Sequence, residues 1–512
     1  MEPCVKQLKQ VLLKLKTKNS GDQPKRGEME AGRRKLSGAY YTPDDVAAAL
    51  VRWVVRDPRD CLLDPASGDG RFLAHHQNSV GVEQDNQALK KAKSRAPWAS
   101  IHHGNFFTWA QNTNTRYECA AGNPPFIRYQ HFNGAIRKHA LEFCRQLGVH
   151  FSGLTSSWAP FLVSAASLLK PGGRMAFVVP AEIGHAPYAV PLLNYLLDHF
   201  SNILLIAVQK KIFADLSEDC WLLFAEYFGG KTRAIRLSQQ VEFSFSPEPP
   251  EVFQVISIEE WRSFNFRLRP ALLSKTTRLL YRDLAGAPSN YLFGDLADVG
   301  IGYVTGANDF FHLRPSLAER AGIPKAFLTP AIRNSKMLGF DAVTPAVIAK
   351  WIQQDAPVLL LRIEREKILP ESVRRYLDSP EGAAARESFK CRVRTPWYVI
   401  PDVRPPNAFL AYMSTREPRL VANLAQCVST NSVHAVNLKG KLPIATLQQR
   451  WKEPLSRLSC EIEGHPLGGG MLKIEPGEAK RVLVRGNSIL QPHESRLLEE
   501  GIDLMRQWRH HA

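Results

Sequence analysis

Two carboxylates and two glycines lie close together in the segment 64–73, which reads Asp-Pro-Ala-Ser-Gly-Asp-Gly-Arg-Phe-Leu and follows a short apolar run. The glycines at positions 68 and 70 allow a tight turn that a ligand can approach closely. Glu83 comes 19 residues after Asp64, where a carboxylate commonly accepts hydrogen bonds from ribose hydroxyls. The acids of the turn would repel phosphate and suit a cationic nucleoside, which favours S-adenosylmethionine over NAD or ATP. An ordinary tight turn is the alternative for this segment taken alone.

A second segment with chemical potential is Asn123-Pro124-Pro125-Phe126, which follows the apolar run 117–121. Two consecutive prolines cannot continue a strand ladder, so the chain must leave the sheet here. Ligands of open α/β sheets bind at this carboxyl edge. The Asn123 side-chain oxygen and the Pro124 carbonyl oxygen could accept both hydrogens of an exocyclic amino group, and Phe126 could stack on a base. The alternative is a polar loop whose asparagine caps the next element.

Further motifs surround these two segments in a definite order. They are Gly38–Pro43 (Gly-Ala-Tyr-Tyr-Thr-Pro), Val82-Glu83 and Gly104-Asn105-Phe106. Together with 64–73 and 123–126, they resemble the ordered motifs of gamma-class DNA amino-methyltransferases. The most similar members are the Taq-like N6-adenine enzymes of restriction-modification systems. Segment 169–180 and Phe213 extend the resemblance, which covers residues 38–228.

The resemblance implies S-adenosylmethionine as cofactor and double-stranded DNA as partner. Thr42 and Asp64 would hold the methionine part of the cofactor, and Glu83 would accept hydrogen bonds from its ribose. Asn105 and Phe106 would frame its adenine. The full set of implied cofactor-binding residues is Tyr40, Thr42, Asp64, Ala66, Gly68, Glu83, Gln84, Asn105, Phe106 and Asn123.

The resemblance also assigns the catalytic residues. Asn123 and Pro124 would bind the target amino group, while Phe126 and Phe213 would sandwich the target base. Two positions depart from the family pattern, which usually has Asp in place of Asn105 and often Tyr in place of Phe126. An amide oxygen accepts a hydrogen bond without charge assistance, so the first change bears on cofactor affinity. Neither change removes a reacting group.

The expected reaction is direct methyl transfer to the N6 atom of an adenine in duplex DNA, protecting host DNA in a restriction-modification system. The adenine must leave the helix to reach such a pocket. Four alternatives stay open: an RNA adenine methyltransferase, a protein glutamine methyltransferase with the same Asn-Pro-Pro-aromatic turn, a cytosine N4 enzyme, and a DNA-binding module with an inactive catalytic half.

The elements that must position these residues alternate between short apolar runs and helical stretches. This pattern predicts an α/β domain with a mostly parallel sheet over residues 38–235. The resemblance implies that this domain has the Rossmann-like class I methyltransferase fold. The expected strands are 61–63, 79–82, 99–102, 117–121, 175–179, 203–208 and 220–226. The expected helices are 43–56, 71–77, 87–96, 158–169 and 190–199.

The other parts of the chain are less regular. We expect a basic extension at 1–37, a Pro-rich linker at 236–252 and a mixed α+β target-recognition domain at 253–512. Because the extension is too short for a nuclease domain, we expect no endonuclease activity and a separate restriction enzyme acting on the same site. The candidate DNA-binding residues, favoured as phosphate contacts or solvated charges over base readers, are Arg333, Lys336, Arg392, Arg394 and Arg404.

Composition limits the remaining possibilities. The 512 residues carry a formal net charge of +17, which favours a polyanionic partner such as nucleic acid. No apolar stretch is long enough to span a membrane, and eight cysteines without a Cys-x-x-Cys pair predict reduced thiols in the cytoplasm. Adjacent histidines at 75–76 and 102–103 point to different faces, so we expect no metal. We expect a monomer.

Overall fold

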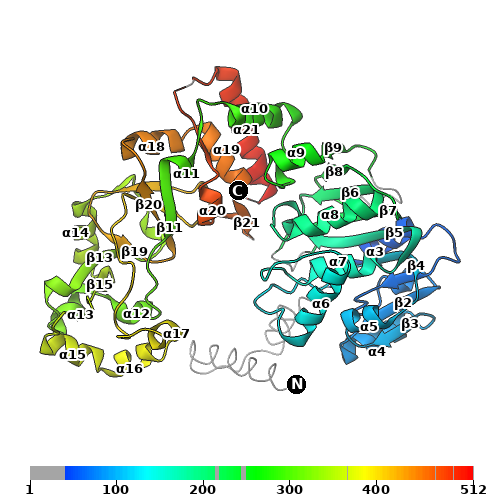
Figure 1. Ribbon diagram of the computed structural model, residues 1–512, viewed down its shortest axis with the longest axis horizontal. Coiled ribbons are helices and arrows are strands. Elements are labelled where there is room, and N and C mark those ends of the chain that lie inside the picture. The colour runs from blue at the N-terminus through cyan, green and yellow to red at the C-terminus, as the bar shows by residue number, and fades with distance from the viewer. Residues whose placement is uncertain are drawn as a thin grey trace. The chain divides into compact units, whose positions relative to one another are not determined.

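The computed structural model describes residues 41–213, 218–243, 250–365, 367–467, 469–487 and 489–510. The predicted basic extension 1–37 and the predicted cofactor contact Tyr40 lie outside the described residues. The chain divides into two compact units (Figure 1), the first ending at Trp261 and the second beginning at Arg262.

The first unit is built on one sheet whose described strands follow the order β3-β2-β1-β4-β5-β7-β6-β8-β9. Strands β3, β2, β1, β4 and β5 are parallel, whereas β7 runs antiparallel to its neighbours β5 and β6. The strands are β1 (Leu62–Asp64), β2 (Ser79–Glu83), β3 (Ser100–His103), β4 (Tyr117–Gly122), β5 (Leu169–Pro180), β6 (Phe200–Val208), β7 (Cys220–Phe228), β8 (Ala234–Gln240) and β9 (Gln254–Ser257).

Helices cover the sheet of the first unit (Figure 1). They are α3 (Asp44–Val54), α4 (Asn86–Arg95), α5 (Phe106–Asn112), α6 (Gly134–Gln146), α7 (Trp158–Ala166) and α8 (Ala189–His199). Helix α3 buries Val46, Leu50 and Val54, whose spacing places them on one face, and Asp44 and Asp45 in its first turn complement the helix dipole. Every residue of α7 is buried, which fits its almost entirely apolar sequence.

The α/β prediction for this unit is confirmed, and each expected strand overlaps an observed one. The helix expected at 71–77 is wrong, because only the short 3-10 turn η1 (Leu73–His75) forms there. The indole N–H of Trp98 donates to the carbonyl oxygens of Leu73 (3.2 Å) and His76 (3.1 Å). In a helix over 71–77 the Leu73 carbonyl would instead accept from the N–H of Gln77. Helices α5 and α6 were not expected.

The second unit is a mixed α+β structure of short elements, as expected. Its two larger sheets have the strand orders β11-β20-β16-β18-β14 and β12-β15-β13-β19 among the described residues. Its strands are β10 (Tyr291–Leu292), β11 (Ala297–Ile301), β12 (His312–Leu313), β13 (Leu328–Ile332), β14 (Ala342–Val343), β15 (Leu359–Leu361), β16 (Ala408–Ala411), β17 (Met413–Ser414), β18 (Leu420–Asn423), β19 (Val428–Ser429), β20 (Val433–Leu438), β21 (His465–Leu467), β22 (Met471–Lys473) and β23 (Leu483–Val484).

Short helices connect these strands, and α9 (Ile258–Ser263) crosses the boundary between the units. The remaining helices are α10 (Lys275–Gly286), α11 (Phe293–Leu296), α12 (Asn308–Phe311), α13 (Pro315–Arg320), α14 (Pro345–Gln353), α15 (Glu371–Leu377), α16 (Pro380–Arg386), α17 (Phe389–Arg392), α18 (Ile444–Trp451), α19 (Pro454–Glu463), α20 (Pro476–Ala479) and α21 (Pro492–Trp508).

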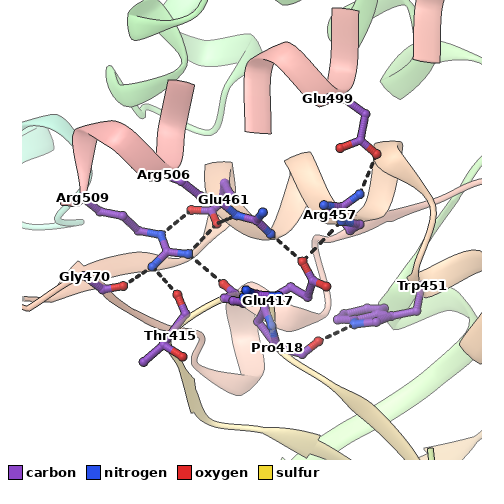
Figure 2. A network of polar contacts seen from close by, with 11 residues as sticks. Thr415, Glu417, Pro418, Trp451, Arg457, Glu461, Gly470, Glu499, Arg506 and Arg509 are labelled. Carbon is purple, nitrogen blue, oxygen red and sulfur yellow. Dashed lines mark hydrogen bonds and ion pairs between the residues drawn. The ribbon is translucent and has the colours of Figure 1, made fainter. Parts of the chain in front are cut away.

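Buried ion pairs fasten the C-terminal helix to the rest of the second unit (Figure 2). The fully buried guanidinium of Arg509 makes two 2.9 Å hydrogen bonds to the carboxylate of Glu461 on α19. It also donates to the carbonyl oxygens of Thr415 and Arg416, each at 2.7 Å. Burying two charges costs desolvation energy, which this paired geometry offsets.

Candidate functional site

The carboxyl group of Asp64 ends strand β1 and is fully buried. Its Oδ1 atom accepts a hydrogen bond from the backbone N–H of Ala66 (3.2 Å), whereas Oδ2 is buried with no partner among the described residues. Burial and, to a smaller extent, the nearby negative charges of Glu83 and Asp69 raise the pKa of Asp64 to about 8, against the opposing effect of the Ala66 N–H donor. A buried acceptor with no donor fits a site for a cationic group such as the methionine ammonium of S-adenosylmethionine.

Gly122, the last residue of β4, brings the second motif beside Asp64. A Cβ atom at Gly122 would lie 2.9 Å from Oδ1 of Asp64 and 3.2 Å from the ring of Phe177. Any larger residue would therefore displace the carboxylate or the ring. Since Asn123 is the next residue in the chain, the Asn-Pro-Pro turn begins directly beside the buried acid.

Glu83 ends strand β2 and fixes the glycine-rich turn. Its Oε2 accepts from the N–H of Gly68 (2.8 Å) and its Oε1 from the N–H of Asp85 (2.6 Å). Burial raises the pKa of Glu83, although these backbone donors oppose the shift. Gly68 has φ +54°, and the Tyr41 ring lies 3.6 Å from where its Cβ would be. The Tyr41 ring therefore packs on the turn. Each carboxylate oxygen of Glu83 accepts one of these hydrogen bonds and can accept another from a ligand.

Arg71 connects the Tyr-Tyr-Thr-Pro motif to the glycine-rich turn through hydrogen bonds. Its Nη1 donates to the carbonyl oxygen of Thr42 (2.7 Å), a buried residue, and its Nε donates to Asp69 (3.2 Å). Arg95 also pairs with Asp69, at 2.7 Å. Two arginines pair with Asp69 and neutralise its charge. Of the two acids of the turn, Asp64 is therefore the one that would attract a cationic ligand.

Asn105 is the N-cap of α5. Its Oδ1 accepts from the N–H groups of Phe107 (3.1 Å) and Thr108 (3.3 Å), so the expected contact with the cofactor adenine would add a third hydrogen bond to this atom. Phe106 is buried and stacks on Phe161 with ring centroids 5.2 Å apart. Among the other predicted contacts, Ala66 lies in the turn and Gln84 is exposed after β2.

A residue that the sequence analysis missed, Ser157, holds the Asn-Pro-Pro turn. The buried hydroxyl of Ser157 donates to the carbonyl oxygen of Pro125 and accepts from the N–H of Ile127 (2.9 Å). Its backbone N–H donates to the carbonyl oxygen of Ile127 (2.9 Å). The available signal was a serine before the apolar helix α7, which suggests an N-cap, yet its hydroxyl bonds to a loop about thirty residues earlier in the chain.

The structure brings the two predicted stacking residues to one hydrophobic cluster. Phe213 is a buried member of the cluster that includes Val46 and Leu50 of α3, and Phe126 packs against it. Nearby, Arg128 and Glu218 form an ion pair of 2.6 Å, which joins the chain after Phe126 to the chain before β7. The two aromatic rings are thus held in one region of the first unit.

Of the five residues predicted to contact DNA in the second unit, two bind other groups of the protein and three are exposed. Arg333 forms an ion pair with Asp309 (2.7 Å), and Arg394 donates to the carbonyl oxygens of Val304 and Thr305. The side chains of the other three are exposed: Lys336, Arg392 and Arg404.

Within the described ranges, no group of three or more His, Cys, Asp or Glu could hold a metal, and no helix is long and apolar enough to cross a membrane.

Three family models match the chain. The model described as "N-6 DNA Methylase" matches residues 29–95, and "Eco57I restriction-modification methylase" matches residues 68–213. The model "Type II methyltransferase M.Eco57I, C-terminal domain" matches residues 267–510. Together they account for most of both units.

Individual proteins are also similar to this chain. Type II methyltransferase M.AccI of Acinetobacter calcoaceticus is 20% identical over 516 residues, covering 93% of this chain and 90% of that protein. M.HincII of Haemophilus influenzae is 21% identical over 210 residues, 40% of this chain and 39% of its own. The type IIG restriction endonuclease BpuSI has a TM-score of 0.43 and 14% identity, covering 93% of this chain and 62% of the solved chain.

The sheet topology, the site at the strand ends and the matched methylase models are those of a class I methyltransferase that depends on S-adenosylmethionine. Within that class, the chain is similar to the type II restriction-modification DNA methyltransferases, which the family models and M.AccI represent. The residues around Asp64 fit the cofactor of this class.

Proposed function

We propose that this protein transfers a methyl group from S-adenosylmethionine to the N6 atom of an adenine flipped out of duplex DNA at a specific sequence. One observation carries the proposal. The Asn123-Pro124 turn begins at the carboxyl end of β4, beside a buried carboxyl group whose second oxygen has no partner among the described residues. Two acceptors for an amino group and an acceptor for a cation therefore lie at neighbouring strand ends.

The residues of the turn would act on the amino group of adenine, whose nitrogen lone pair is delocalised into the ring. Hydrogen bonds from the amino group to the Asn123 oxygen and the Pro124 carbonyl oxygen favour tetrahedral geometry and localise that lone pair. S-adenosylmethionine supplies an electrophilic methyl group. Transfer would form the N–C bond as the S–C bond breaks and would release S-adenosylhomocysteine, and the nitrogen would give one proton to water.

Positioning supplies much of the rate in this scheme. Well-oriented reacting groups can lower a barrier by about 7–11 kcal/mol. Ser157 fixes the turn through three hydrogen bonds, and Phe126 and Phe213 would stack on the two faces of the base. Stacking offsets the few kcal/mol needed to extrude the base from the helix.

The biological role follows from the reaction. We infer that the protein marks host DNA as the modification partner of a separate endonuclease with the same recognition sequence, and that it acts as a monomer. A chromosomal substrate would place this activity in the cytoplasm.

Product analysis tests the proposed reaction. The protein is incubated with tritiated S-adenosylmethionine and either unmethylated genomic DNA, total RNA or mixed proteins. The proposal predicts label in duplex DNA, recovered as N6-methyladenine after digestion to nucleosides. Recovery as N4-methylcytosine, or label confined to RNA or protein, would overturn it.

One observation favours a second candidate, an RNA adenine methyltransferase. The tRNA1(Val) (adenine(37)-N6)-methyltransferase of Actinobacillus succinogenes is 29% identical over 136 residues. That match covers only 24% of this chain, whereas the family model of a DNA methyltransferase C-terminal domain covers residues 267–510. The RNA sample of the same experiment decides between the two.

A further inference from the structure

A basic pocket of about 620 Å³ lies in the second unit, at the segment that contains α17. Three arginines line it, Arg386, Arg392 and Arg394, against one acid, Glu387. Among the ion pairs of the described residues, none joins Glu387 to these arginines. The pocket therefore presents an excess of positive charge to solvent, which is the arrangement that attracts an anion.

Arg394 is the most informative of the three arginines. Its guanidinium is partly buried and donates to the carbonyl oxygens of Val304 and Thr305, with no carboxylate partner among the described residues. Burial consequently lowers the pKa of Arg394. A half-buried guanidinium paired only with neutral carbonyls keeps an uncompensated charge, and donors remain for an incoming anion.

The segment around the pocket is held in place before any ligand binds. Cys391 is fully buried, and Trp397 packs against Phe310 with ring centroids 5.8 Å apart. Gly306 has φ +89°, and a Cβ there would lie 2.8 Å from the Cβ of Lys390. Close packing on both sides fixes the backbone that carries the arginines, so little ordering entropy is lost on binding.

Two large apolar side chains stand exposed on the same segment. Phe389 is 65% exposed and Val393 is 64% exposed, and they lie four residues apart at the start of α17 and just after its end. The ammonium of Lys390 lies 5.9 Å from the centre of the Phe389 ring. Exposed apolar groups interleaved with cations are suited to a nucleic acid, whose charged backbone encloses apolar base and sugar surfaces.

We propose that Arg386, Arg392 and Arg394 bind backbone phosphate of duplex DNA, while Phe389 and Val393 lie against the adjacent sugars and bases. This inference rests on the proposed function, since it names the element of the second unit that contacts the substrate. Phosphate suits the pocket because its oxygens accept paired hydrogen bonds from guanidinium groups.

Affinity for DNA as a function of salt tests the proposal without knowledge of the recognition sequence, because phosphate contacts do not depend on sequence. Binding of the full-length protein to a fluorescent random-sequence duplex is measured at several salt concentrations. We expect Arg386→Gln and Arg392→Gln each to weaken binding about five-fold to ten-fold and to reduce the slope of log affinity against log salt by about 1.

Two further variants sharpen the test. Phe389→Ala removes no charge, so it should weaken binding and leave the salt slope unchanged. Arg282→Gln removes an exposed arginine on α10, away from the pocket, and should change neither quantity. Melting temperatures close to that of the natural sequence would exclude misfolding as the cause.

The outcomes separate this inference from the proposed function. Unchanged affinity and slope in both pocket variants, or equal losses in Arg282→Gln, would overturn the pocket while methyl transfer to DNA still stands. Salt-dependent DNA binding that the pocket variants weaken, in a protein that methylates no DNA, would overturn the proposed function and support the pocket.

Discussion

The two units of the molecule position their functional side chains in different ways. In the first unit, Asp64 and Glu83 end neighbouring parallel strands and Asn123 follows a third, so the strand order alone brings them to one edge of the sheet. In the second unit, the pocket arginines lie at the end of the seven-residue helix α16, on the four-residue helix α17 and on irregular chain. The first arrangement depends on many backbone hydrogen bonds, whereas the second depends on single side chains.

The largest expected effect is the loss of a buried ion pair in the second unit. Arg509→Ala leaves the carboxylate of Glu461 buried, with only Arg506 at 3.6 Å as a remaining ion-pair partner among the described residues. We expect a loss of about 3–5 kcal/mol in the free energy of unfolding. Urea titration measures it. Arg496→Ala, an exposed change on the same helix, should cost under about 0.5 kcal/mol, and equal losses would show that α21 does not depend on the pair.

The next effect concerns the pH dependence of cofactor binding in the first unit. Asp64 has a pKa of about 8 and is therefore protonated in the free protein at neutral pH. Binding of a cationic ligand favours the ionised form, so affinity should fall about tenfold per pH unit below that value. Calorimetry in buffers of different ionisation enthalpy measures the proton released.

The matched control for this prediction is Asp64→Asn. The amide cannot ionise, so the variant should bind the cofactor more weakly and lose most of the pH dependence below 8. An identical pH profile in both proteins would show that another group titrates.

A smaller effect should follow from releasing the catalytic turn. Ser157→Ala removes the hydroxyl that bridges Pro125 and Ile127, and we expect kcat to fall about tenfold because a misplaced turn orients the target poorly. Cofactor affinity should stay unchanged. Ser167→Ala, at the other end of α7, is the control. A rise in KM for cofactor with normal kcat would contradict a role in positioning the turn.

The smallest effect should come from a single polar contact in the first unit. Trp98→Phe keeps most of the aromatic ring but removes the donor to Leu73 and His76. We expect a loss of about 1 kcal/mol in the free energy of unfolding, measured by urea titration. A loss as large as that of Arg509→Ala would mean that the two units do not differ in their dependence on single side chains.

The comparison also explains how much the sequence could predict. Apolar runs of strand length and residues such as Asp64 and Asn123 are local signals, so the α/β fold of the first unit was predictable and was confirmed. The residue roles assigned from the resemblance stay predictions. The two prolines of the Asn-Pro-Pro turn were enough to predict where β4 ends, because prolines cannot continue a strand ladder.

What the sequence could not predict depends on contacts between distant residues. Trp98 donates to two carbonyl oxygens of the segment 71–77 from more than twenty residues away, and Arg95 pairs with Asp69 from a different element. In the second unit, strands of two residues carry no periodicity, and the packing of α21 depends on Arg509 meeting Glu461. No local pattern contains this information.

The central claim is that the Asn123 side chain accepts a hydrogen bond from the target amino group beside the cofactor. Single-turnover methyl transfer to unmethylated duplex DNA by the Asn123→Ala variant tests it most directly, with cofactor affinity measured in parallel. We predict that the rate falls at least about 100-fold while cofactor affinity stays nearly unchanged. A normal rate in this variant would contradict the account.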